Sequence, residues 1–175
     1  GTMTVTNCGI FTYQGSGGGI GLNLQNYGNA TLSNTDFTRM TINSYGGTIN
    51  YNSSNSNTSS SIRLHDGAIA TFDNLRSTSI FIELFPNTSL VLNNSDATCE
   101  FVGIYETANF EHNGSFSGTG FYIINKGTAD LNLTGFQATG LRIATASTAT
   151  TTWDNSGSFS ATSKRTTSFT TLNSN

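Results

Sequence analysis

The stretch Phe121–Gly140, FYIINKGTADLNLTGFQATG, is the clearest copy of a repeat that runs through the chain. It begins with a short apolar strand, turns at Asn125–Gly127, continues with a second strand of alternating apolar and polar residues, and ends at a Gly/Thr corner. Segments of this kind follow one another with spacings of 20, 22, 18, 21, 20 and 20 residues, beginning at Ile20, Met40, Ile62, Ile80, Phe101, Phe121 and Leu141. A nearly constant period of this length is typical of a solenoid in which each repeat forms one coil.

Each segment places apolar residues at fixed positions. Side chains two residues apart on a strand lie on the same face, so the first and third residues of the segments form columns on one side. One coil alone cannot bury these side chains, but parallel coils stacked about 4.8 Å apart merge the columns into one core. The third-residue column reads Leu22, Ile42, Leu64, Ile82, Gly103, Ile123 and Ile143, and the second strands add columns running from Ala30 and Leu32 to Ala149 and Thr151.

These columns predict an all-β protein, a single-stranded parallel β-helix (β-solenoid) with about 20 residues per coil and about eight coils. We expect a right-handed coil, because crossovers between parallel strands are overwhelmingly right-handed. The solenoid is expected to span residues 1–160, and residues 161–175 to form a C-terminal tail or an irregular cap. In the opening stretch, Met3, Val5 and Ile10 are spaced like the end of a coil.

Composition narrows the classes of partner. Only 10% of the residues are charged and the net charge is −3. The chain lacks the basic stripe that nucleic-acid binding requires, so we expect no nucleic-acid partner. No apolar run approaches the roughly 18 residues of a membrane helix, and we expect no membrane insertion. A polar surface of Asn, Ser and Thr with few charges favours an extracellular or cell-surface location.

The positions of the two cysteines provide a test of the predicted stacking of coils. Cys8 and Cys99 lie four to five coils apart, which corresponds to about 20 Å along the rod. A disulfide needs Cα atoms within roughly 7 Å, so we predict two free thiols. No cluster of metal-ligating residues accompanies either cysteine, and neither a metal nor another cofactor is expected.

The outward positions of the first strands become apolar between the segments that begin at Ile80 and Phe121. They are expected to form one contiguous apolar patch of Phe81, Val102, Ile104, Tyr122 and Ile124. Exposed patches of this kind usually bind a partner or are covered by another part of the chain. Three interpretations are open: the C-terminal tail, with Phe169 and Leu172, covers the patch; the patch mediates self-association or partner binding; or it is a ligand groove.

Two sets of polar residues are weaker candidates. His65 and Glu83 share an outward column on adjacent coils, with Arg63 diagonal to Glu83, and a His–carboxylate pair can form half of a catalytic site. In a second column Asp73 and Glu111 are two coils apart, about 9.6 Å by strand spacing, close to the carboxylate separation of inverting glycosidases. Neither set has a distinguishable nucleophile or a groove rich in acids and aromatics, so we expect a protein that is not an enzyme.

The coil length, the Asn/Ser/Thr-rich corners and the aliphatic columns of residues 3–160 together resemble the β-helical stalks of bacterial surface and secreted adhesins. These include autotransporter passenger domains and filamentous-haemagglutinin-like proteins. The resemblance rests on the repeat pattern and transfers no site residues. It implies a rod, often part of a longer chain, that displays binding surfaces away from a cell.

The function expected is therefore that of a non-enzymatic extracellular adhesin or scaffold that binds a host or environmental glycan or protein. One alternative is a polysaccharide-active β-helix of lyase, hydrolase or phage-tailspike type, which clustered carboxylates in a groove would favour. A second is an ice-binding solenoid, which needs a flat face of regularly repeated threonine. A third is a minor pilin or fibre-tip component that carries a solenoid head.

Overall fold

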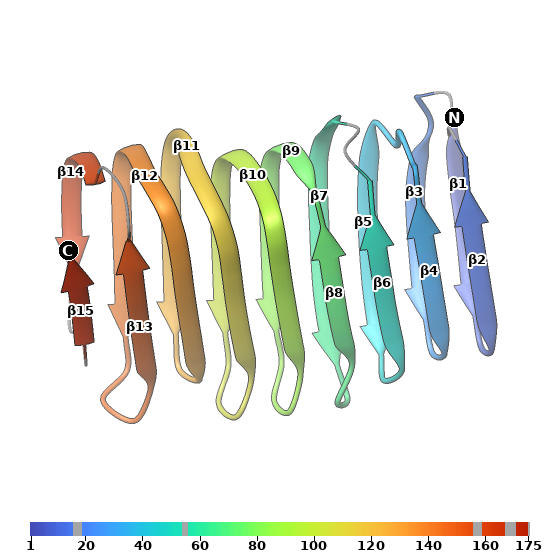
Figure 1. The fold of residues 1–175 in the computed structure, drawn as a ribbon. Coiled ribbons are helices and arrows are strands. Elements are labelled where there is room, and N and C mark those ends of the chain that lie inside the picture. Colours follow the sequence, from blue (N-terminus) through green and yellow to red (C-terminus); the bar gives the residue numbers. More distant parts are fainter. Residues whose placement is uncertain (16–18, 54–55, 156–158, 167–170, 175) are drawn as a thin grey trace.

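In a computed structural model the chain winds into a rod of stacked β-coils, with the N-terminus at one end and the C-terminus at the other (Figure 1). The structure describes residues 1–15, 19–53, 56–155, 159–166 and 171–174. Every strand pairing within these residues is parallel, and the coils lie about 20 residues apart in about seven turns. The predicted all-β parallel solenoid is confirmed.

Two faces of the rod are made of strands. The first face contains β1 (Thr2–Asn7), β3 (Gly21–Asn26), β5 (Arg39–Tyr45), β7 (Ser56–His65) and β9 (Arg76–Leu84). The second face contains β2 (Ile10–Gln14), β4 (Asn29–Ser33), β6 (Thr48–Asn52), β8 (Ile69–Asp73) and β13 (Thr150–Asn155). Three long strands bend around a corner and belong to both faces: β10 (Ser89–Ile104), β11 (Asn109–Asn125) and β12 (Thr128–Thr145).

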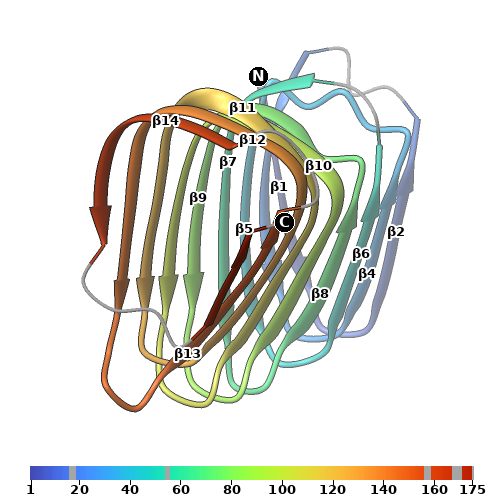
Figure 2. The ribbon, with the colours of Figure 1, turned by 60° about the vertical axis from the view of Figure 1, so that its left-hand side comes forward.

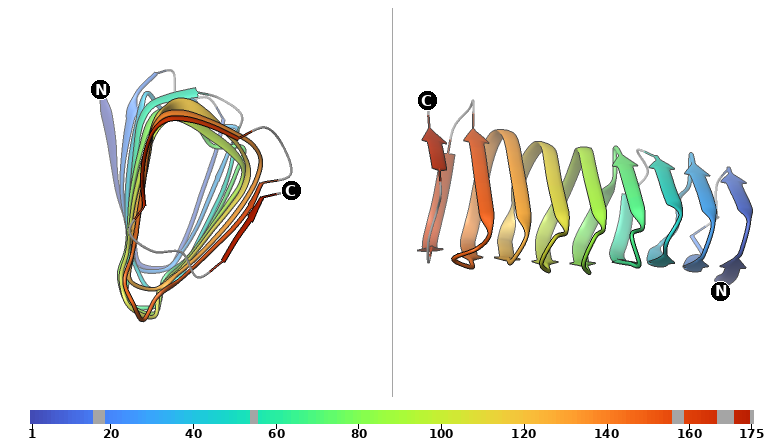
Figure 3. Two further views of the ribbon diagram at one scale, coloured as in Figure 1. Left: turned by 90° about the vertical axis from the view of Figure 1, so that its left-hand side faces the viewer. Right: turned by 90° about the horizontal axis from the view of Figure 1, so that it is seen from below.

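Seen along its axis, the rod has a rounded triangular cross-section (Figure 3), and a turned view shows both strand faces running the length of the molecule (Figure 2). The first face runs in the order β1-β3-β5-β7-β9-β10-β11-β12. Beyond residue 160 the pairing continues, because β14 (Phe159–Thr166) pairs with β12 and β15 (Thr171–Ser174) pairs with β13. The described part of the predicted tail therefore extends the backbone stack.

The core fills the interior of the coils. Side chains alternate between buried and outward along each strand, and Ile82 and Ile123 are both completely buried in one continuous apolar cluster. Buried apolar surface contributes about 25 cal/mol per Å², so the merged columns supply the main stabilisation that a single coil lacks.

The predicted inward positions of the fifth segment, which begins at Phe101, were wrong by one residue. Strand β10 turns Phe101 and Gly103 outward, whereas Val102 and Ile104 are 0% and 2% exposed and belong to the core. The pairs Val102–Ile82 and Ile104–Leu84 fix this register against β9. The alternation of a strand allows either face to point inward, and this register buries two aliphatic side chains.

The prediction for the opening stretch was also wrong. Met3 and Val5 pair with Leu22 and Leu24, so residues 2–7 form the first strand of a coil rather than its end. Ile10 is 86% exposed and faces outward. The inward positions of β2 belong instead to Phe11 and Tyr13, which pack against the core.

The corners are made by residues in the left-handed region of φ. Asn34, Asn74 and Asn94 hold the corner after the second-face strands, with φ between 47° and 60°. Asn tolerates this conformation better than most residues, because its short polar side chain bonds locally. At the turn between the two faces Asn87 has φ 64° and Thr107, one coil later, has φ 62°.

Candidate functional site

The outward residues of three neighbouring coils form what we call the outer face: Phe81, Glu83, Phe101, Gly103, Tyr122 and Ile124. Phe81, Phe101 and Tyr122 are in register, as are Glu83, Gly103 and Ile124. Phe81, Phe101 and Tyr122 are half-buried, and Ile124 is 39% exposed. Three members of the predicted apolar patch therefore lie together here, while Val102 and Ile104 are replaced by Phe101 and the gap at Gly103.

One end of the outer face is organised by an ion pair and a ring stack. Phe81 and Phe101 are stacked with ring centroids 5.3 Å apart and an interplanar angle of 6°. Arg63 lies over the Phe81 ring at 5.2 Å, and its Nε donates to Glu83 Oε2 at 2.6 Å. Because Arg63 and Glu83 are partly exposed, this pair contributes at most about 1 kcal/mol to folding, and its main effect is to orient both side chains.

The other end of the outer face is shaped by Tyr122. A Cβ at Gly120 would lie 2.6 Å from Tyr122 Cε2, and one at Gly140 would lie 2.8 Å from Tyr122 Oη. The ring therefore rests over two glycine backbones. Glycines in strands commonly have an aromatic ring packed over them in this way, because the missing side chain leaves room for it.

A second set of rings lines the corner next to the outer face, and we call it the corner ring column: Tyr27, Tyr45, His65, Phe85 and Tyr105. Consecutive ring centroids are 4.1 to 5.0 Å apart, with interplanar angles of 19° or less. Lys126 continues the column, with its Nζ 5.6 Å from the centre of the Tyr105 ring.

The predicted pairing of His65 with Glu83 was wrong. His65 is in register with Tyr45, and the residue in register with Glu83 is Arg63. The first-residue alignment had matched Ile62 with Ile80, whereas the structure pairs Ile62 with Ile82. A register error of two residues leaves each side chain on the same face of its strand, so the burial pattern does not reveal it. The error nevertheless changes which residues are neighbours on adjacent coils.

A notch of about 130 Å³ opens where Gly103 interrupts the outer face. Its lining is Glu83, Phe101, Gly103, Ile104, Tyr105, Ile124 and Lys126. Two rings, a carboxylate and an ammonium thus surround one small hollow. A few polar groups on an apolar wall are the usual chemistry of a small-molecule site.

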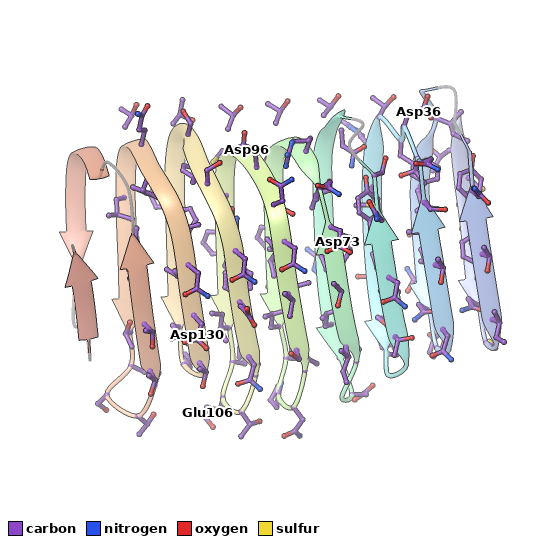
Figure 4. All side chains as sticks on the ribbon, viewed as in Figure 1. Asp36, Asp73, Asp96, Glu106 and Asp130 are labelled. Atoms are coloured by element: carbon purple, nitrogen blue, oxygen red, sulfur yellow. The ribbon has the colours of Figure 1, made fainter. Side chains whose placement is uncertain are left out.

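The acidic residues of the second face do not form the predicted pair. Glu111 is in register with Asp130, whereas the column of Asp73 passes through Asn93 and Asn113, two residues further along the strand. Asp73 Oδ1 accepts from Asn93 Nδ2 at 2.9 Å, and Glu111 Oε1 accepts from Asn113 Nδ2 at 2.7 Å. Asp73 and Asp130 both lie on this face, whereas Asp96 lies at its upper edge and Glu106 at the lower turns (Figure 4).

The amide groups around these acids form a ladder. Asn113 Nδ2 donates to Asn93 Oδ1 at 2.9 Å, and Asn132 Nδ2 donates to Asn113 Oδ1 at 2.8 Å. Both candidate carboxylates therefore serve as acceptors in a structural array. Such an array ties neighbouring coils together.

A regular row of threonines was missed in the sequence. Strand register and backbone hydrogen bonds place one exposed threonine in the same position of six successive coils. The threonine row consists of Thr38, Thr58, Thr78, Thr98, Thr119 and Thr139. In the sequence, each of these threonines stands two residues before a buried position of the first face. A search for apolar columns alone does not detect this spacing.

The core also contains a buried ion pair that the sequence pattern does not predict. Glu100 and His112 are fully buried, with His112 Nδ1 3.4 Å from Glu100 Oε1, and His112 Nε2 lies 3.4 Å from the Ser95 carbonyl oxygen. Burial works to lower the pKa of His112, but the Glu100 carboxylate, the Ser95 carbonyl and Asp96 outweigh it, so the pKa is raised above its ordinary 6.5.

Cys8 is exposed, Cys99 is half-buried, and both are free thiols, as predicted. Among the described residues, no group of three or more His, Cys, Asp and Glu side chains is arranged to hold a metal ion. The same residues contain no helix that is long and apolar enough to cross a membrane. Phe169, one of the two residues expected to cover the apolar patch, lies outside the described residues, and the backbone of Leu172 pairs with Trp153.

Comparison with known proteins gives no relative: no family model, no curated protein and no solved structure matches this chain.

Proposed function

We propose that the protein is a non-enzymatic solenoid of the extracellular space or a cell surface, and that it binds a glycan through the outer face. The observation that carries this proposal is the outer face itself, where three aromatic rings, an aliphatic side chain and an Arg–Glu pair are displayed together on rigid strands. Sites on regular elements are held more precisely than sites on loops.

The chemistry of the outer face suits a sugar. Aromatic rings present a negative π-face that attracts the partly positive C–H groups of a sugar ring, and burying them adds apolar stabilisation. Arg63 and Glu83 supply donors and acceptors for hydroxyl groups, and their mutual hydrogen bond keeps both in place. A rigid rod of stacked coils is suited to display such a surface, which agrees with the adhesin-like repeat pattern.

A screen of the protein against immobilised glycans tests the proposal. Phe81→Ala and Tyr122→Ala are expected to lower binding at least tenfold, because each removes a ring from the outer face. Ile69→Ala is the matched control, because Ile69 is 53% exposed on the second face and should bind like the original protein. Equal binding by all three variants would contradict a glycan site on the outer face.

The same variants also test whether the outer face mediates self-association. If the outer face mediates self-association, sedimentation will show an oligomer that depends on protein concentration and is lost in Phe81→Ala. A protein that stays monomeric at all concentrations and binds no glycan would leave the outer face without either role.

A second candidate function, ice binding, is favoured by the threonine row. Six exposed threonines repeat at the coil spacing of about 4.8 Å, which supplies a regular line of hydroxyl and methyl groups. If the row binds ice, the protein will show thermal hysteresis, and Thr78→Lys will remove it while Thr71→Lys on the second face will not. Absence of hysteresis in the unsubstituted protein would exclude this candidate.

A further inference from the structure

Gly103 occupies a position where the fold does not require glycine. It lies within strand β10, and its φ is not in the left-handed region. A Cβ built there would lie 3.8 Å from the Ile82 carbonyl oxygen and 3.9 Å from Phe101 Cε1, which are ordinary contacts. By contrast, a Cβ at Gly118 or Gly127 would collide with a backbone carbonyl of the preceding coil.

Glycine in a strand interior lowers stability, because it loses more conformational freedom on folding and has no side chain to pack. The other residues that share this outward column in neighbouring coils, such as Arg63, Glu83 and Ile124, all carry side chains that pack there. What Gly103 provides is the notch. A strand glycine without a backbone reason commonly marks a place where a ligand approaches closely.

The walls of the notch come from three coils. On the coil of Gly103 itself, Phe101 precedes it by two residues and Tyr105 follows it by two, and both rings line the notch. Glu83 borders the notch on the preceding coil and Ile124 on the following coil. Lys126, over the Tyr105 ring, completes the rim.

We propose that this notch holds one pyranose ring of the glycan, a step that rests on the function proposed above. The volume of about 130 Å³ suits one ring rather than a chain. Glu83, whose charge is balanced by Arg63, accepts hydrogen bonds from sugar hydroxyls, and Lys126 donates to them.

The decisive variant is Gly103→Thr, which fills the notch with a β-branched residue. We expect its melting temperature to rise, because Thr favours strands, and its binding to the glycan array to fall at least tenfold. Ala144→Thr is the matched control, because Ala144 shares the outward column two coils away and does not line the notch. It should bind within twofold of the original protein.

Lys126→Met and Gly103→Ala give a second measurement that does not depend on the larger side chain. Both are expected to weaken binding severalfold without loss of the fold. If Gly103→Thr, Gly103→Ala and Lys126→Met all bind as well as the original protein while Phe81→Ala does not, the notch is not the sugar site and the outer-face proposal stands. If the unsubstituted protein binds none of the immobilised glycans, both proposals fail.

Discussion

At the scale of single residues, the least expected feature is a carboxylate and an imidazole buried together in the core. Glu100 takes the inward position that Ile80 and Phe121 take in the adjacent coils, and His112 lies between Leu92 and Leu131. Neither residue is predicted from the sequence to be buried. An alternating pattern assigns charged residues to the outside, and only the register of the neighbouring coils shows that these two point inward.

The buried pair predicts a dependence of stability on pH. Because the pKa of His112 is raised in the folded state, the folded protein keeps this proton to a higher pH than the unfolded chain does. The resulting stabilisation is fully present below about pH 6.5 and is lost as the pH rises through the folded-state pKa. The free energy of unfolding, measured with urea between about pH 6 and pH 9, is therefore expected to fall, by at most about 1.4 kcal/mol per pH unit.

The double variant Glu100→Ile, His112→Leu continues both apolar columns and should remove this slope. Replacing a buried ion pair by well-packed apolar residues is often neutral or stabilising, so the variant is expected to fold at least as well. His65→Gln, which changes the half-buried histidine of the corner ring column, should keep the slope. A slope that survives in the double variant would show that other groups cause it.

At the scale of elements, the sequence predicted which segments are strands better than it predicted their register. In β10 the residues Phe101, Val102 and Ile104 are all apolar, so the alternation can be read with either face inward. Stacking on the preceding coil determines which face points inward, because Val102 and Ile104 continue the columns of Ile82 and Leu84. The outer face and its notch follow from this one-residue choice and could not be predicted without it.

The turn between the two faces carries a strained residue. Thr107 is β-branched and has φ 62°, a conformation that costs on the order of 1 kcal/mol or more. It is retained by hydrogen bonds in which Thr107 Oγ1 donates to Asn87 Oδ1 at 2.9 Å and accepts from the Asn87 amide at 3.0 Å.

Thr107→Asn is expected to stabilise the protein by about 1 kcal/mol, because Asn tolerates this conformation and already occupies the same turn position one coil earlier. The gain is measured as a higher midpoint in urea unfolding. Thr128→Asn is the control, since Thr128 begins strand β12, where replacing threonine should bring no gain. A less stable Thr107→Asn protein would mean that the threonine hydrogen bonds outweigh the strain.

At the scale of the whole molecule, the repeat length alone was sufficient to predict a parallel solenoid. Coils about 20 residues long stack because each can bury its apolar residues only against its neighbours. The same reasoning predicted two free thiols from the distance between Cys8 and Cys99 along the rod. Surface features that join different coils, such as the threonine row, the corner ring column and the notch, require the register and were not predicted.

The central claim is that successive coils stack in parallel with Phe81 beside Phe101 on the outside and Val102 in the core. Disulfide trapping tests it directly in a protein carrying Cys8→Ser and Cys99→Ser. In-register parallel neighbours lie about 4.8 Å apart, within the Cα separation of a disulfide. The pair Phe81→Cys, Phe101→Cys is predicted to form an intramolecular disulfide by mass spectrometry, and the pair Phe81→Cys, Val102→Cys is predicted not to. A disulfide in the second pair and none in the first would contradict the account.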